Sequence, residues 1–357
     1  MRYQLKEPVR QFGFSLIELM IAMVLGMGLM GGALHVFINS KQTFAFSEEM
    51  TWMQESARYA MEFVSRDVRM AGYFGCGSQS MAVTLDPSSG SNAWAYDFDK
   101  GLVGYDGDDS GFPSDFPTAS VPTLASGTLP KSDAFTVLRG ATEDEQFTVT
   151  GHNTSSAVIS VTPNHTFSSG QILVVSDCDH AAVFQTTGGN KIKLGHNKGG
   201  SVAPGNCTKG LGLPVVCTAN GTAYQYDGDA FVMEVVSHAY FVNTASNNVP
   251  SIYRQEIKGG LVAGSETEEL AQGVESIQTI YGLDVNGDGA VNRYVTADNV
   301  ADWTSVMSIQ IHLLMRSISE VTAEPVTFRF VGNSYTPTDR FLRKEFTSTI
   351  FIRNRGV

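Results

Sequence analysis

The sequence predicts an α+β protein in which one long N-terminal helix packs on one or more antiparallel β-sheet domains. Three observations lead to this prediction: an almost uncharged apolar run near the start, a helical stripe of apolar residues after it, and short β-type runs between polar loops. With 357 residues, 42% of them apolar, the chain is long enough to bury a sizeable core. Its high Gly content and low charge are typical of a secreted or surface β-rich protein.

The first apolar run covers residues 14–38 and contains no charge except Glu18. As a helix it would be about 37 Å long at ~1.5 Å per residue, which is enough to cross a bilayer. Residues 1–12 are net basic and are therefore expected to stay on the cytoplasmic side. Because a carboxylate is costly in hydrocarbon, Glu18 is predicted to be a functional residue with a partner.

Four glycines in the second half of this run leave two expectations open. Each Gly costs about 1 kcal/mol inside a helix, so the segment is expected to bend or unwind locally. Alternatively, it packs tightly against other helices, because small residues allow close approach. These glycines are Gly26, Gly28, Gly31 and Gly32.

Residues 39–72 continue the helix with an amphipathic pattern. Charged residues, Asp67 among them, lie mostly off the apolar stripe, and Gly72 is expected to end the helix. The stripe needs a cover, and a β-rich domain packed on it would supply one. Its members recur at three- and four-residue steps: Phe46, Met50, Met53, Ala57, Met61, Val64, Val68 and Ala71.

Residues 73–357 are predicted to form a β-rich globular domain. Long loops are expected at 82–130 and 188–213, where Gly and polar residues are frequent. The alternating end of the chain is a further candidate strand. The other predicted strands are 134–138, 146–150, 157–162, 172–176, 181–187, 230–243, 251–257, 274–284, 305–317 and 325–332.

Four cysteines, Cys76, Cys178, Cys207 and Cys217, form an even set without CxxC spacing, which argues against a zinc site. Two disulfides are expected if the globular part lies outside the cytoplasm. Cys207 and Cys217 are placed to close the edge of the second loop, which would leave Cys76 to pair with Cys178. Four cysteines allow three pairings, so this pairing is one of three.

A candidate calcium loop occupies residues 284–292, DVNGDGAVN. Asp284, Asn286 and Asp288 alternate, and the Gly that follows permits the sharp turn that such loops need. Ala290 would add a backbone carbonyl and Asn292 a side-chain oxygen. Position twelve is Val295 where an EF-hand has Glu, so a helix–loop–helix EF-hand is excluded. Either calcium or an unliganded Asp/Asn/Gly turn remains open here.

Neither catalysis nor nucleic-acid binding is predicted. The chain contains no HExxH, GxSxG or P-loop motif, and its histidines are scattered, so we expect no enzyme. The formal net charge of −12 repels phosphate backbones, which makes nucleic acid a poor main partner.

The N-terminal order of basic leader, Gly13, aromatic Phe14 and Glu18 resembles the class III signal of type IV pilins and pseudopilins. That resemblance implies that a prepilin peptidase cuts after Gly13 and methylates the new amino terminus at Phe14. It also implies that Glu18 pairs with the amine of a neighbouring subunit, because pairing lowers the cost of burying each charge.

Later motifs narrow the resemblance to the PilW-type minor pilins, which are related to the J-type pseudopilins of type II secretion. They are AGYFGC at 71–76, SDC at 176–178, YGLDVNGDG at 281–289 and TSTIFIRNR at 347–355. Known folds in this group have a long N-terminal helix against one or more antiparallel sheets.

The resemblance implies a minor pilin that primes pilus assembly or lies near the pilus tip. Residues 1–13 would be the leader and residues 14–38 a single inner-membrane span, with the globular domain first in the periplasm and then on the pilus. The implied partners are the prepilin peptidase, the inner-membrane assembly platform, other minor and major pilins, and a tip adhesin. The alternatives are a type II secretion pseudopilin and a membrane-anchored surface enzyme or binding module.

Overall fold

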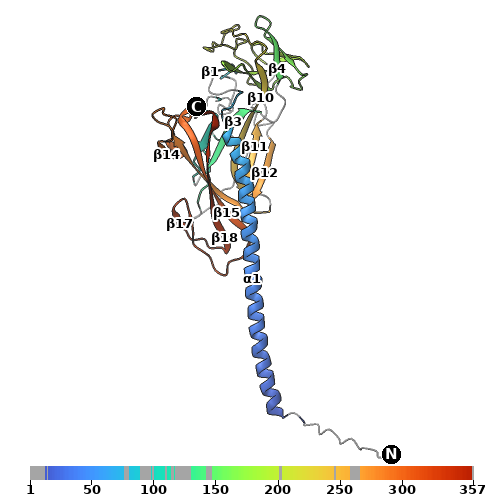
Figure 1. Ribbon diagram of the computed structural model, residues 1–357, viewed down its shortest axis with the longest axis vertical. Helices are drawn as coiled ribbons and strands as arrows, with labels where there is room; N and C mark the ends of the chain where they lie inside the picture. Colours follow the sequence, from blue (N-terminus) through green and yellow to red (C-terminus); the bar gives the residue numbers. More distant parts are fainter. Residues whose placement is uncertain are drawn as a thin grey trace, which may run out of the picture. The chain divides into compact units, whose positions relative to one another are not determined.

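The computed structural model describes residues 13, 15–75, 80–88, 98, 100–108, 111–113, 116, 130–141, 147–200, 203–244, 247–257 and 266–355. The chain divides into two compact units, Met1–Thr51 and Trp52–Val357. The first unit carries most of one helix, and the second carries the end of that helix together with the β-sheets (Figure 1).

Helix α1 extends without interruption from Leu16 to Arg69, as the apolar run and the amphipathic stripe predict. The unwinding considered for the glycine cluster does not occur, because Gly26 and its neighbours are helical. Burial begins only in the last third of α1. There the helix buries Met53, Ala57, Ala60, Val64, Asp67 and Val68.

The larger sheet is built around β10 (Phe231–Thr244), the longest of its strands. The first residues of β10 pair with β4 and β6, and its last residues pair with β3 and β11. One strand therefore joins two groups of strands into a twelve-stranded sheet among the described residues. The others are β1 (Ser80–Val83), β2 (Leu102–Tyr105), β3 (Ala134–Gly140), β4 (Phe147–Asn153), β5 (Val158–Thr162), β6 (Ile172–Ser176), β7 (His180–Gln185), β8 (Gly188–Asn190), β9 (Lys193–Gly195), β11 (Pro250–Ile257) and β12 (Glu266–Gln272).

The C-terminal part forms a second, antiparallel sheet in the order β14-β13-β15-β18. These strands are β13 (Val274–Leu283), β14 (Arg293–Val295), β15 (Val306–Glu320) and β18 (Phe341–Phe351). A separate hairpin joins β16 (Phe328–Phe330) to β17 (Asn333–Tyr335). Short 3-10 turns are η3 (Ala297–Asn299), η4 (Trp303–Ser305) and η5 (Arg353–Arg355).

The main core lies between the end of α1 and both sheets. Apolar side chains of α1, such as Ala57 and Val64, share one buried cluster with Val137 of β3, Tyr240 of β10 and Ile309 of β15. Figure 1 shows these strands beside the C-terminal end of α1. A second cluster fills the space among β4, β5, β6 and β7. The cover that the amphipathic stripe requires is therefore present from Met53 onward, whereas Phe46 stays exposed.

The predicted fold class is confirmed, with five local corrections. The loop predicted at 82–130 contains β2, and the loop predicted at 188–213 contains the short β8–β9 hairpin, because two or three alternating residues are too few to signal a strand. The acidic strand β12 was not predicted, since its sequence ETEELAQ has low β-propensity. The strand predicted at 325–332 is shorter, because the chain turns at Val331 into β17. One pair, β1 with β7, is parallel.

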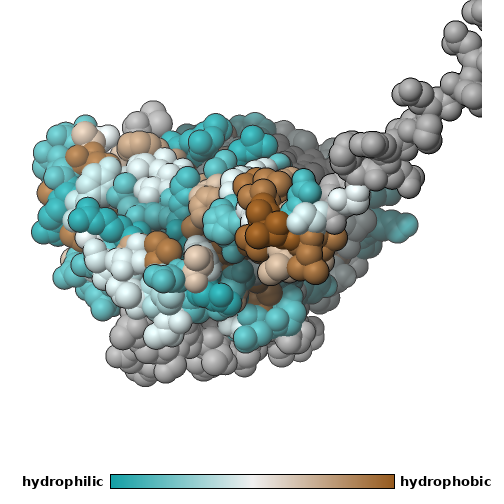
Figure 2. Space-filling model, turned by 90° about the horizontal axis from the view of Figure 1, so that it is seen from below, coloured by the Kyte–Doolittle hydropathy of each residue, from teal (hydrophilic) through white to brown (hydrophobic). Residues whose placement is uncertain are grey.

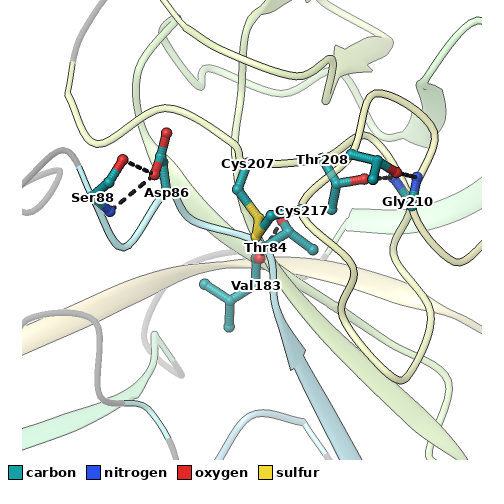
Figure 3. The surroundings of a disulfide bond; sticks show 10 residues. Thr84, Asp86, Ser88, Val183, Cys207, Thr208, Gly210 and Cys217 are labelled. Atoms are coloured by element: carbon teal, nitrogen blue, oxygen red, sulfur yellow. Dashed lines mark hydrogen bonds between the residues drawn. A yellow bond between two sulfur atoms is a disulfide. The ribbon is translucent and has the colours of Figure 1, made fainter.

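A disulfide joins Cys207 to Cys217, the pair expected to close the second loop. The backbone N–H of Cys207 donates to the carbonyl of Thr84 at 2.8 Å, and the Thr84 hydroxyl donates to the carbonyl of Val183 (Figure 3). The closed loop is thereby attached to the β1–β7 edge of the sheet. Cys76 lies outside the described residues, so its pairing with Cys178 stays a prediction.

Asp133, just before β3, connects the two sheets through a buried carboxyl group. One oxygen accepts from the Gln278 amide at 2.8 Å, and the other accepts from the backbone N–H of Thr279 at 2.8 Å, both on β13. Burial raises the pKa of Asp133 to about 7, and the negative charge of Asp106 acts in the same direction. Hydrogen bonds from Thr279 and Gly107 only partly oppose this shift.

The free energy of unfolding is expected to fall as pH rises from about 4 to 7, because the folded protein keeps a proton on Asp133 that the unfolded chain releases. The contribution is fully present below pH ~4 and has a slope of at most about 1.4 kcal/mol per pH unit. Denaturant titrations at several pH values should show a shallower fall for Asp133→Asn. The exposed control Asp229→Asn should keep the wild-type slope, and an unchanged slope in Asp133→Asn would refute the assignment.

Candidate functional site

The predicted processing site lies at the start of α1. Gly13 is exposed and precedes the helix, whose first residue is Leu16. The N–H of Leu19 donates to the carbonyl of Ser15 at 3.1 Å, which begins the helical hydrogen bonding. Phe14 lies outside the described residues, so its role as the new amino terminus stays a prediction. The described residues on either side of Phe14, Gly13 and Ser15, both lie outside the regular helix.

Glu18 is exposed in the first turn of α1. A carboxylate at this position is stabilised by the partial positive charge that unpaired N–H groups give to a helix N-terminus. That interaction is local and weak, about 0.3–1 kcal/mol, and it does not remove the cost of placing the charge in an apolar environment. The role predicted for Glu18, pairing with an amine of another subunit, is untested by a single chain.

The N-terminal part of α1 exposes an unusually large apolar surface. Leu16, Met27, Leu29 and Met30 are each more than 70% exposed, and Figure 2 shows a dense cluster of hydrophobic residues. Among the described residues, α1 is the one helix long and apolar enough to cross a membrane. A surface of this size does not stay in water, so it must be covered by lipid or by other protein.

Three glycines of this segment, Gly28, Gly31 and Gly32, keep one side of the helix thin, whereas Gly26 lies on the opposite side. A Cβ atom added at Gly26, Gly28, Gly31 or Gly32 would meet nothing within 4 Å. Close packing within this chain therefore does not explain them. Small residues on an apolar helix allow the backbone of another helix to approach closely, so the second of the two sequence-based expectations fits this surface.

A buried charge cluster centred on Asp67 joins the end of α1 to the large sheet. One carboxylate oxygen of Asp67 accepts from Nε of Arg139 on β3 at 2.5 Å. The other lies 2.6 Å from Nδ1 of His238 and accepts from the Tyr240 hydroxyl at 2.6 Å, both on β10. Three side chains from two neighbouring strands thus converge on one helical carboxylate.

The surroundings of Asp67 favour its charged form. Burial alone would raise its pKa, but hydrogen bonding and charge from His238, the charge of Arg139 and the Tyr240 hydroxyl outweigh burial and hold the pKa well below its usual range. Burial and the nearby carboxylate together raise the pKa of Tyr240, which therefore remains a hydrogen-bond donor. Each charge of a buried ion pair depends on the other, because removing either partner leaves an uncompensated buried charge.

Sequence reasoning missed this cluster by grouping Asp67 with the charged residues off the apolar stripe. Its position carries a signal, however: Ala60, Val64 and Asp67 follow steps of four and three residues, the spacing of the buried face. An acid at such a position requires partners from the structure that covers it. Which residues supply them depends on the pairing of β3 with β10, which no local pattern reveals.

The structure also brings together two histidines that are far apart in the sequence. Nε2 of His152 lies 3.0 Å from Nε2 of His196, and the backbone N–H of Tyr226 donates to Nδ1 of His152. Nδ1 of His152 must then be an acceptor, so its Nε2 carries the proton and donates to His196. Burial lowers the pKa of His152 to about 4 and that of His196 to about 3, so both are neutral at pH 7.

The candidate calcium loop is an exposed turn between β13 and β14. Oδ2 of Asp284 accepts from the N–H of Gly289 at 2.8 Å, and Oδ1 accepts from the N–H of Gly287 at 2.7 Å. These backbone hydrogen bonds hold the pKa of Asp284 below its usual range. The other predicted ligands also make hydrogen bonds within the loop: Asn286 with Asp288, Asp288 with Ala290, and Asn292 with Val285.

This geometry is that of an Asx-type turn, in which the carboxylates face N–H donors. Within the described part of the chain, no group of three His, Cys, Asp or Glu side chains is arranged to hold a metal ion. A cation would therefore have to reorganise the loop oxygens that now accept hydrogen bonds. Calcium binding at Asp284, Asn286, Asp288, Ala290 and Asn292 stays a prediction.

Comparisons with known proteins match two parts of the chain. Residues 239–354 match the family model described as Type IV Pilus-assembly protein W, and residues 9–34 match the Prokaryotic N-terminal methylation motif. No curated protein matches the chain. A solved type IV-like pilin from Thermus thermophilus aligns over 87% of this chain and 97% of its own, with 11% identity and a TM-score of 0.31. At that TM-score the alignment adds nothing to the architecture already described.

Replacing the buried carboxylate should destabilise the protein strongly. Asp67→Asn removes the charge that compensates Arg139, so the free energy of unfolding should fall by about 3–5 kcal/mol. Chemical denaturation of the full chain in a mild detergent measures this change. The exposed acid Glu55 on the same helix is a matched control, and Glu55→Gln should change stability by less than about 0.5 kcal/mol. Equal effects of the two substitutions would contradict the proposed importance of the cluster.

Calcium should raise the melting temperature of the protein if the loop at 284–292 binds the ion. Millimolar calcium covers the range of weak extracellular calcium sites, so binding should be detectable there. Asp288→Ala should abolish the rise, whereas Asp229→Ala, an exposed acid outside the loop, should leave it intact. The absence of any rise in the wild-type protein would remove the calcium assignment.

Proposed function

Because residues 239–354 match the Type IV Pilus-assembly protein W model and residues 9–34 the N-terminal methylation motif, we propose that the chain is a PilW-type minor pilin that is matured and built into a pilus. Maturation consists of cleavage after Gly13 and methylation of the new amino terminus at Phe14. The observation that carries this proposal is the combination of an exposed cleavage residue, a first-turn carboxylate and a long exposed apolar helix.

The physical role of Glu18 follows from the chemistry of cleavage. Cutting after Gly13 creates an ammonium group at Phe14 within the same apolar layer as Glu18. Neither charge is stable alone in hydrocarbon, and an ion pair between neighbouring subunits reduces the cost of both. The pair also fixes how far one helix slides along the next, because a shifted helix would leave both charges without a partner.

We place the subunit at the start of assembly or near the pilus tip. The Trp52–Val357 unit contains two large sheets and a separate hairpin, and it is much larger than the helix segment that precedes it. A large domain is accommodated most easily where no further subunit has to pack beyond it. Its partners in this role are other minor and major pilins, the inner-membrane assembly platform and a tip adhesin. This role involves no catalysis.

Maturation can be tested by intact mass. The full chain co-expressed with a prepilin peptidase should lose residues 1–13 and gain the mass of one methyl group. The same measurement on Gly13→Leu should show an uncut chain, because the peptidase must fit a small residue at the cut. A wild-type chain that remains uncut would overturn the proposal.

Assembly should depend on Glu18 while folding and maturation do not. Glu18→Ala should be cleaved normally but incorporated poorly into pili, because the amine of a neighbouring subunit then has no partner. Incorporation is measured by the amount of the protein in sheared pili, with Glu48→Ala, another exposed acid of α1, as the control. Normal incorporation of Glu18→Ala would refute this role. Loss of protein secretion rather than piliation on deletion would instead identify a type II secretion pseudopilin.

A further inference from the structure

A groove of about 680 Å³ lies on the outer side of the last turns of α1, where η5 packs beside the helix end. It is entirely within the Trp52–Val357 unit. Its walls are unusual for a chain with a net charge of −12, because they hold more basic than acidic side chains. The charged and aromatic lining residues are Arg66, Arg69, Arg353, Glu62, Tyr59 and Phe63.

The fold gathers these arginines from two distant parts of the sequence. Arg66 and Arg69 are three residues apart and so share one face of α1. Arg353 belongs to η5, which is positioned by a hydrogen bond from Nδ2 of Asn354 to the carbonyl of Ala71 at 3.4 Å. All three arginines are exposed, and Glu62 is the one acid in the lining.

The helix dipole explains the presence of only two of the three arginines in this groove. Basic residues in the last turn offset the negative end of the helix dipole, which accounts for Arg66 and Arg69. Arg353 is not in α1, and its presence in the groove needs another reason. The groove also includes Tyr59, a residue that is 54% exposed, and Phe63, whose ring already lies under the guanidinium of Arg254 at 4.8 Å.

We propose that this groove binds an acidic segment of a neighbouring pilin subunit. Guanidinium groups form paired hydrogen bonds with carboxylates, and the exposed ring of Tyr59 offers a surface for an apolar side chain between them. The inference rests on the proposed function, because assembly is what brings another subunit against α1. The positive charge of the arginines favours an acidic occupant. The aromatic side chains of Tyr59 and Phe63 favour a peptide over a lipid phosphate.

The binding test uses the purified full chain in a mild non-ionic detergent and the fluorescein-labelled peptide EELEEL as the probe. Fluorescence anisotropy should show binding that weakens as salt is added. The double variant Arg69→Glu/Arg353→Glu should bind at least about tenfold more weakly, the change expected for a loss of about 1.4 kcal/mol. Arg58→Glu, which reverses an exposed arginine of α1 outside the groove, should bind within about twofold of wild type.

Several outcomes would overturn the inference: no peptide binding by the wild type, unchanged binding by the double variant, or an equal loss in Arg58→Glu. Binding of phosphatidylglycerol vesicles that is lost in the double variant, with no peptide binding, would identify a lipid site instead. Thermal unfolding of the double variant checks that it still folds. Because the peptide assay needs no filament, its failure leaves the intact-mass and Glu18 results standing, and the two proposals can fail separately.

Discussion

The buried contact between Asp67 and its three partners is the constraint on which the rest of the structure depends. It fixes the end of α1 against β3 and β10, and β10 is the strand that joins both parts of the large sheet. Apolar packing alone would tolerate small shifts of a helix across a sheet. A carboxylate that must meet Arg139, His238 and Tyr240 at once permits one position, since any shift leaves a buried charge unpaired.

This constraint divides α1 into two segments with different tasks. From Met53 onward the helix belongs to the core of the globular unit, whereas its earlier residues keep their apolar side chains exposed. The first segment carries Glu18 and the glycine cluster, on which the proposed membrane anchoring and helix–helix packing depend. The second segment packs into the core of the domain, and its outer face carries the arginine-lined groove.

Local patterns predicted α1, most long strands and the Cys207–Cys217 bond, because each depends on residues close in sequence. These local patterns failed where a contact depends on residues that are far apart in the sequence. Asp67 was assigned to the charged face because its partners come from strands 72 or more residues away, and β12 is held in the sheet by pairing with β11 despite its acidic sequence. The loop at 284–292 folds as a turn in which Asp284 accepts backbone hydrogen bonds, and its binding of calcium stays a prediction.

Hydrogen–deuterium exchange of the full chain in detergent tests most directly whether the end of α1 is fixed to the sheet. Amides from Met53 to Val68 should exchange as slowly as those of β10, and they should exchange through the same opening event. In Asp67→Asn the helical amides should be released before those of β10. Rapid, independent exchange of this segment in the wild-type protein would contradict the account, because the helix would then be attached without being fixed.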